Sequence, residues 1–208
     1  MKILICDDHK IVREGLRQIL LQLDGNNTIE EAGNGNDAIN LAKKETFDII
    51  LLDISMPDRN GLEVLQAIKS KWPLTNVLML SMHPQEQYAI RALKLGASGY
   101  LSKDTAAEEL LLAVKKVSAG KKYISQVLAE NLAEHLDDDN NLQKHETLSS
   151  REFEVMLELA NGKSLGEIGD KLFISNKTVS TYRTRIMDKM ELCKNTMLTR
   201  YCLENNLI

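Results

Sequence analysis

The chain has 208 residues, enough for two modest domains, and its 43% hydrophobic and 27% charged residues are typical of soluble globular proteins. Its net charge of −4 arises from 26 basic and 30 acidic side chains. No apolar run approaches the roughly 18 residues that span a bilayer, which excludes a membrane-spanning helix. The start Met1-Lys2-Ile3 leads directly into acidic residues, and the cysteines lack metal-ligand spacing. We therefore expect a cytoplasmic protein without a signal peptide.

The first 120 or so residues alternate between strand-like and helix-like segments. Short aliphatic runs predict strands over residues 2–6, 28–32, 47–52, 77–80 and 99–101. Apolar residues at helical spacing predict helices over 11–23, 37–44, 61–72, 85–95 and 105–118. Five βα units with short loops indicate an α/β fold, a doubly wound (βα)5 parallel sheet of the flavodoxin-like kind.

Polar side chains follow four of the five predicted strands. Asp7 and Asp8 follow the first strand, Asp53 the third, Ser81 the fourth and Lys103 the fifth. The carboxyl ends of parallel strands meet at one edge of the sheet, where ligand crevices form. Three carboxylates in one crevice repel each other unless a cation joins them, and Mg²⁺ prefers oxygen ligands. A lysine and a hydroxyl beside them suit a phosphoryl group, whereas no glycine-rich loop is present to hold a nucleotide.

Together with the segments Asp53-Ile54-Ser55-Met56-Pro57 and Tyr100-Leu101-Ser102-Lys103, these groups resemble the receiver domain of two-component response regulators. The resemblance covers essentially all of residues 1–120, and the receiver domain is expected over residues 1–122. It implies that Asp53 accepts a phosphoryl group from a sensor histidine kinase and that the cofactor is Mg²⁺.

The same resemblance implies a role for each pocket residue. The implied metal site consists of Asp8, Asp53 and the Ser55 carbonyl, with Asp7 acting through water. Lys103 and Ser81 are expected to contact the phosphoryl oxygens, and Tyr100 matches the switch aromatic that turns inward as Ser81 moves. Ser55, His83 and Asp104 occupy positions where family members vary and are expected to set the lifetime of the phosphoryl group; taken alone, a loop histidine such as His83 is more often simply solvated.

Residues 123–146 are predicted to form a linker. Over 125–146 there is one basic side chain against six acidic ones. Apolar residues between Val127 and Leu136 predict a short helix, which the run Asp137-Asp138-Asp139 would end. We expect this charged run to be flexible and exposed.

Residues 147–208 predict a small all-α domain. Ser149 with Glu152, and Ser164 with Glu167, form capping boxes at the starts of two helices, and Ser175 caps a third. The expected helices span 150–160, 165–172, 176–190 and 195–205. A helix, a short turn and a second helix of these lengths form a helix-turn-helix unit.

The third of these helices has two different faces. At about 100° per residue, Val179, Ile186 and Met190 share a buried stripe, with Tyr182 and Arg183 at its flank. The opposite face carries short polar side chains between long cations, a combination that suits the DNA major groove. The candidate DNA contacts are Lys177, Thr178, Ser180, Thr181, Arg183, Thr184, Arg185 and Lys189. Arg183 is expected to reach a phosphate from the flank; on charge alone, an ordinary solvated helix face remains open.

The motifs of this part resemble the LuxR-type DNA-binding domain. They are Leu148-Ser149-Ser150-Arg151-Glu152, Glu167-Ile168, Leu172-Phe173-Ile174-Ser175, Lys177-Thr178-Val179 and Asn206-Leu207-Ile208. The resemblance covers 147–208 and places the whole chain among the NarL/FixJ response regulators. One departure is Gly169, where the family usually has alanine, and this glycine is expected to cost about 1 kcal/mol of helix stability.

The sequence therefore predicts a transcription regulator, not an enzyme, with at most self-dephosphorylation. Its implied partners are a sensor histidine kinase and double-stranded DNA, which it is expected to bind as a homodimer when phosphorylated. One alternative is an aspartyl-phosphate phosphatase of the haloacid dehalogenase type, but the second acid of those enzymes is replaced here by Ser55. Another alternative keeps the receiver and makes the rear domain a protein-binding module.

Overall fold

The computed structural model describes residues 1–82, 86–125, 129, 143–205 and 207–208. The chain divides into two compact units, Met1–Leu136 and Asp137–Ile208, each with its own core. In the described parts of the chain, no helix is both long and apolar enough to cross a membrane.

The first unit is a five-stranded parallel sheet with the order β2-β1-β3-β4-β5. Its strands are β1 (Lys2–Cys6), β2 (Thr28–Ala32), β3 (Ile49–Asp53), β4 (Val77–Ser81) and β5 (Gly99–Ser102). Every residue of β3 and β4 is buried, because helices cover both faces of the central strands. The predicted doubly wound α/β fold is confirmed.

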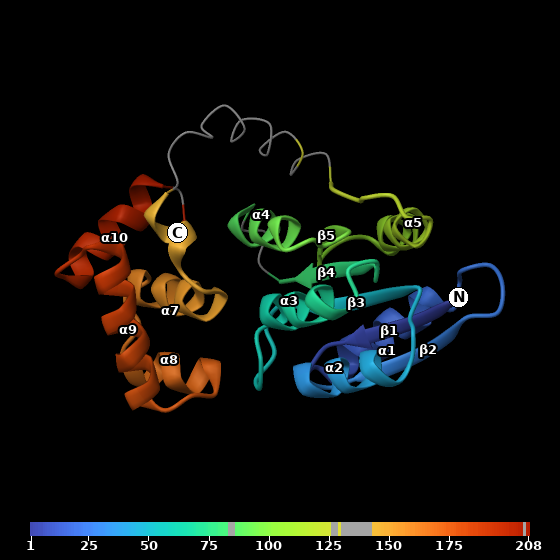
Figure 1. Ribbon diagram of the computed structural model, residues 1–208, viewed down its shortest axis with the longest axis horizontal. Coiled ribbons are helices and arrows are strands. Elements are labelled where there is room, and N and C mark those ends of the chain that lie inside the picture. Colours follow the sequence, from blue (N-terminus) through green and yellow to red (C-terminus); the bar gives the residue numbers. More distant parts are fainter. Residues whose placement is uncertain (83–85, 126–128, 130–142, 206) are drawn as a thin grey trace. The chain divides into compact units, whose positions relative to one another are not determined.

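Helices cover both faces of this sheet (Figure 1). They are α1 (Lys10–Leu20), α2 (Gly35–Lys44), α3 (Gly61–Lys71), α4 (Glu86–Lys94) and α5 (Ala107–Ser118). Helix α1 packs beside α5, while α3 packs between α2 and α4. Side chains alternate along each strand, so Ile3, Ile49 and Leu51 join Leu20 and Val117 in the core under α1 and α5.

Several boundaries differ from the predicted ones for local reasons. Helix α1 ends at Leu20 and not at residue 23, and the prediction ran too far because Leu23 is buried although it lies beyond the helix. Helix α2 begins at Gly35 because the Asn34 side chain accepts the backbone N–H of Asp37 and caps it. Strand β3 includes Asp53 itself.

The chain continues along the outer edge of the sheet after α5. Tyr123 forms an isolated parallel bridge with Gly99 of β5. Its backbone N–H donates to Ser98 O at 2.9 Å, and its carbonyl accepts from Tyr100 N at 3.3 Å. A Cβ on Gly99 would lie 2.6 Å from the Tyr123 carbonyl oxygen, so glycine is required for this close approach.

The second unit is helical, as predicted. It contains the 3₁₀ helix η1 (Lys144–Thr147) and the helices α7 (Ser150–Ala160), α8 (Leu165–Leu172), α9 (Asn176–Met190) and α10 (Asn195–Glu204). Both predicted capping boxes are present, at Ser149 and at Ser164. Helix α9 packs against both α7 and α8. Arg151 joins α7 to the end of α8, because its guanidinium bonds Glu154 and the Leu172 carbonyl.

Gly169 of α8 faces the turn that leads into α9. The Ile174 N–H donates to the Gly169 carbonyl at 2.9 Å. A Cβ at Gly169 would lie 2.7 Å from the Ile174 carbonyl oxygen and 2.8 Å from Asn176 Oδ1. The glycine therefore gives room for a close approach of the turn, which offsets its poor helix propensity.

Candidate functional site

The first candidate site lies at the carboxyl edge of the parallel sheet, around the end of β3. Asp53 is 1% exposed, and its carboxylate accepts the backbone N–H of Ser55. Gly61 begins α3 directly behind it and donates its N–H to Ile54 O at 2.8 Å. A Cβ on Gly61 would overlap the Asp53 carbonyl oxygen, so only glycine allows the loop to return this closely.

Lys103 joins the acids of two strands. Its Nζ lies 2.6 Å from Asp7 Oδ2 and 2.9 Å from Asp53 Oδ2. All three side chains are nearly buried, with 7% or less of each exposed. The Lys103 N–H donates to Ser81 O at 2.8 Å, which fixes the start of the lysine loop. The structure thus places Asp7, Asp53, Ser81 and Lys103 close together, as expected from their positions after parallel strands.

Burial and ion pairing shift the pKa values of Asp53 and Lys103 in opposite directions. Burial raises the pKa of Asp53 to about 6, although the charge of Lys103 opposes the rise. Burial alone would lower the pKa of Lys103, but the charges and hydrogen bonds of Asp53 and Asp7 outweigh it and raise that pKa. A buried carboxylate is therefore held beside a permanent positive charge.

Ser81 and Tyr100 form the side of this pocket on β4 and β5. The Tyr100 ring is 6% exposed, and its hydroxyl is hydrogen-bonded to the Ser81 side chain. Burial raises the pKa of the Tyr100 phenol to about 12, with a further rise from the Asp53 charge. The aromatic side chain thus points inward in this structure, in contact with the hydroxyl proposed to move.

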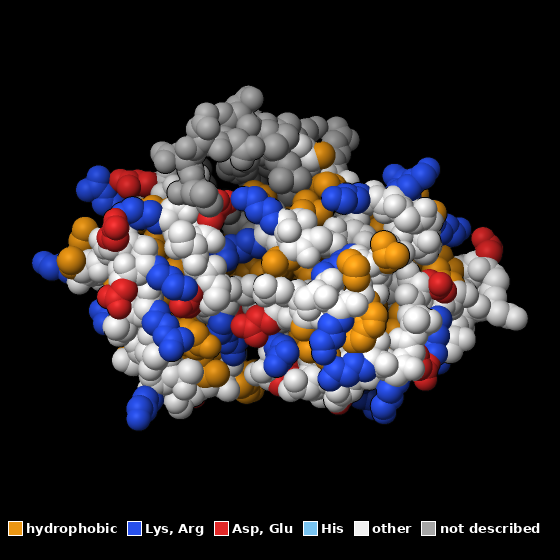
Figure 2. Space-filling view, in the orientation of Figure 1, with side chains coloured by type: hydrophobic (Ala, Val, Ile, Leu, Met, Phe, Trp, Pro, Cys, Tyr) orange, Lys and Arg blue, Asp and Glu red, His pale blue; other side chains and the backbone are white. Residues whose placement is uncertain are grey.

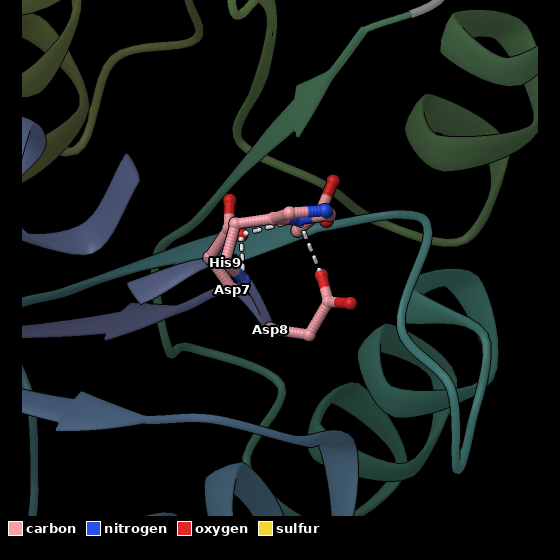
Figure 3. Close-up of side chains that lie close together, drawn as sticks. Asp7, Asp8 and His9 are labelled. Carbon is pink, nitrogen blue, oxygen red and sulfur yellow. Dashed lines mark hydrogen bonds and ion pairs between the residues drawn. The ribbon is translucent and has the colours of Figure 1, made fainter. Parts of the chain in front are cut away.

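A group of possible metal ligands surrounds Asp53. Ligand atoms of Asp7, Asp8, His9 and Asp53 all lie within 4.8 Å of one another. His9 was not predicted as a pocket residue; its Nδ1 lies 2.8 Å from Asp8 Oδ1 and 3.4 Å from Asp7 Oδ1 (Figure 3). Its backbone N–H also donates to Asp7 Oδ1 at 2.8 Å. Three converging carboxylates suit a hard divalent cation such as Mg²⁺.

Two of the predictions fall on residues that the structure does not describe. They are His83, which was expected to affect the lifetime of the phosphoryl group, and the acidic run Asp137 to Asp139 of the linker.

The second candidate site is the exposed face of α9. Six of the eight predicted contacts are exposed: Lys177, Ser180, Thr181, Thr184, Arg185 and Lys189. Among the described residues, neither Lys177 nor Arg185 has an ion-pair partner, so both cations are available to a phosphate. Basic and acidic side chains are interspersed on the face of this unit shown in Figure 2.

Three of the predicted α9 contacts bond either the cap of their own helix or another helix of the unit. Thr178 Oγ1 lies 2.8 Å from the capping Ser175 Oγ. Arg183, which was expected to reach outward to a phosphate, donates from Nε to Asn195 Oδ1 at 2.9 Å. Lys189 Nζ lies 2.6 Å from Glu152 Oε2. These contacts connect α9 to its own cap, to α10 and to α7.

Glu152 is the buried end of the Lys189 contact. It is 3% exposed and also accepts the Ser149 N–H at 2.7 Å as part of the capping box. Burial alone would raise the pKa of Glu152, but the hydrogen bonds from Lys189 and Ser149 outweigh it and lower that pKa. The same holds for Glu158: burial alone would raise its pKa, but the hydrogen bonds and charges of Lys163 and Lys171 outweigh burial and lower that pKa.

The comparisons with known proteins agree with this division into two sites. Residues 3–115 match the model of the response regulator receiver domain, and residues 146–202 match that of bacterial regulatory proteins of the luxR family. The chain is similar to response regulator UvrY of Escherichia coli (strain K12), with 32% identity over all of this chain and 95% of the relative. It is 31% identical to response regulator GacA of Pseudomonas aeruginosa, over all of this chain and 98% of that relative.

Solved structures of response regulators are also similar to this chain. One is RcsB from Salmonella enterica serovar Typhimurium, bound to a promoter in the presence of the phosphomimetic BeF3−. It is 28% identical to this chain, with a TM-score of 0.60, and the match covers 97% of each chain. The response regulator ChrA of a haem-sensing two-component system matches with 31% identity and a TM-score of 0.53, over 100% of this chain and 98% of the other.

Proposed function

Because the chain belongs to the response regulators that carry a receiver domain and a LuxR-type DNA-binding domain, we propose that phosphorylation of Asp53 controls DNA binding by α9. The observation that carries this proposal is the Lys103 ammonium, held between Asp7 and Asp53 at 2.6 and 2.9 Å. A buried carboxylate beside a fixed positive charge is suited to accept a group that brings negative charge. The family matches do not favour the phosphatase and protein-binding alternatives.

The proposed reaction is transfer of a phosphoryl group to a carboxylate oxygen of Asp53. The donor is the phosphohistidine of a sensor kinase or a small acyl phosphate. The oxygen forms a bond to phosphorus, and the bond from phosphorus to the donor nitrogen or oxygen breaks with its electrons leaving on the donor. Burial raises the pKa of Asp53 to about 6, while the charge and hydrogen bond of Lys103 oppose this rise and favour the ionised, nucleophilic form.

The residues proposed to hold Mg²⁺ are Asp8, Asp53 and the Ser55 carbonyl, with Asp7 acting through water. Their support is the convergence of carboxylate oxygens within 4.8 Å. When bound, the ion supplies positive charge that offsets the charge on the phosphoryl oxygens. Lys103 is proposed to move from pairing two carboxylates to contacting a phosphoryl oxygen.

The proposed switch is a change of partner at Ser81. In the structure, the side chains of Ser81 and Tyr100 are hydrogen-bonded. A phosphoryl group on Asp53 would compete for the Ser81 hydroxyl, and Tyr100 would then adjust at the β5 edge of the pocket. The protein is proposed to bind double-stranded DNA as a homodimer when phosphorylated, and, apart from accepting the phosphoryl group, to catalyse at most the hydrolysis of its own aspartyl phosphate by water.

Labelling with acetyl phosphate and Mg²⁺, read on a phosphate-affinity gel, tests the assignment of Asp53. Asp53→Asn should abolish the shifted band, and Asp8→Ala should weaken both Mg²⁺ binding and labelling. The matched control is Asp24→Asn, the same chemical change at a side chain that is 97% exposed; it should label like the parent. Undiminished labelling of the Asp53→Asn protein would refute the proposal.

A further inference from the structure

Two threonines on the exposed face of α9 use their hydroxyl hydrogens within their own helix. Thr181 Oγ1 donates to Lys177 O at 3.0 Å, and Thr184 Oγ1 donates to Ser180 O at 3.1 Å. A hydroxyl has a single hydrogen, so neither group can donate to a DNA base while these bonds persist. The chemistry left to each threonine is its methyl group and an oxygen lone pair.

The two side chains are close neighbours. Residues three apart on a helix have Cβ atoms about 5–6 Å apart, and both Thr181 and Thr184 are exposed. Successive bases on one DNA strand are about 3.4 Å apart. Two methyl groups at this spacing can therefore contact bases that are one or two steps apart.

Neighbouring residues supply the hydrogen-bond donors that the threonines lack. Lys177 and Arg185 have no ion-pair partner, and the Ser180 hydroxyl has no hydrogen bond, within the residues that the structure describes. These three side chains therefore have donors available for phosphates and base acceptors. The threonines between them form a small apolar surface with no donor.

We infer that Thr181 and Thr184 recognise thymine through its C5 methyl group. The inference rests on the proposed binding of α9 in the major groove, and it specifies what this site selects. Thymine alone among the four bases presents a methyl group in that groove, and threonine methyl groups contact it favourably. The preferred DNA should therefore carry one or two thymines opposite the middle of α9.

Replacement of thymine by deoxyuridine provides the direct test, because it removes only the methyl group. The preferred duplex is first selected from random DNA with the full chain treated with acetyl phosphate. Its thymines are then replaced one at a time, and affinity is measured by fluorescence anisotropy. We expect one or two positions at which uracil weakens binding about fourfold, the value of one buried methyl group, and no effect at the remaining positions.

Two variants separate the methyl group from the hydroxyl. Thr181→Val keeps a methyl group at the same place and should bind like the parent, with the same response to uracil. Thr181→Ser keeps the hydroxyl but lacks the methyl group, so it should bind more weakly and lose the response to uracil at the position that Thr181 contacts. Helix content measured by circular dichroism confirms that both variants fold.

Two results would overturn the inference. One is specific binding with no response to uracil at any position. The other is loss of sequence preference in Thr181→Val with retention in Thr181→Ser, which would mean that the hydroxyl reads the base. Failure to select any preferred duplex would instead refute the proposed DNA-binding function, before any uracil is introduced.

Discussion

Lys189 provides a sharp test of how α9 uses its cations. From the sequence it is a candidate DNA contact, yet its ammonium lies 2.6 Å from the Glu152 carboxylate. We therefore expect Lys189→Met to lower the stability of the helical unit and to leave the salt dependence of DNA binding unchanged. Methionine keeps a long unbranched side chain and removes the charge.

The size of the stability loss follows from the exposure of the two partners. A hydrogen bond to a charged group contributes about 1.5–3 kcal/mol. Lys189 is 43% exposed, so solvent screening reduces its contribution, whereas Glu152 is 4% exposed and loses one donor of its buried carboxylate. We expect a loss of about 1 kcal/mol. For a unit of this size, that corresponds to a melting temperature about 4–8 °C lower.

The assay compares Lys189→Met with a matched variant on the same helix. Lys177→Met removes the same charge at a lysine without an ion-pair partner among the described residues. It should reduce the log–log salt slope of DNA binding by about 0.9 and leave the melting temperature unchanged. Calorimetry gives the melting temperatures, and hydrogen exchange of α7 and α9 peptides assigns the transitions. A reduced salt slope with unchanged stability in Lys189→Met would refute the reasoning.

Two further predictions concern the helical unit. The folded-state pKa values of Glu152 and Glu158 lie below 4.5, so their contribution to stability is present above the unfolded pKa and is lost as the pH falls through the folded pKa values. Melting curves should therefore show a transition temperature that falls below about pH 5, and that falls less steeply in Glu158→Gln. A transition temperature independent of pH would contradict this. Gly169→Ala should lower the melting temperature despite a gain of about 1 kcal/mol in helix propensity, because its Cβ would lie 2.7 Å from the Ile174 carbonyl oxygen. The control Gly166→Ala, whose nearest atoms are 3.9 Å away, should raise it, and equal shifts in the two variants would contradict the packing argument.

The sequence predicted the fold and much of the pocket because both depend on local patterns. Aliphatic runs such as Ile49 to Leu52 specify buried strands, and a residue that follows a parallel strand is placed at a known edge of the sheet. Capping boxes at Ser149 and Ser164 set helix starts through contacts only three residues apart. The connections between the parallel strands are short and follow the usual right-handed rule.

Contacts between distant residues were beyond this reasoning. The Lys189–Glu152 pair joins residues 37 apart in the sequence, and neither residue alone indicates its partner. The Arg183–Asn195 bond likewise depends on how α10 packs. His9 was missed because it follows the two acids in a loop, where periodicity gives no information. The hydrogen bonds of Thr181 and Thr184 are local, but the choice of rotamer decides whether they form.

The bridge between Tyr123 and Gly99 has a consequence for self-association and for fragment design. A terminal strand of a sheet offers unpaired backbone groups to foreign strands, which is a route to aggregation. At β5, the Tyr123 backbone bonds both Ser98 and Tyr100, so those two groups are already paired. A fragment cut directly after α5 would expose them and leave the short strand β5 open to intermolecular pairing. A receiver fragment intended to stay monomeric should therefore retain Tyr123.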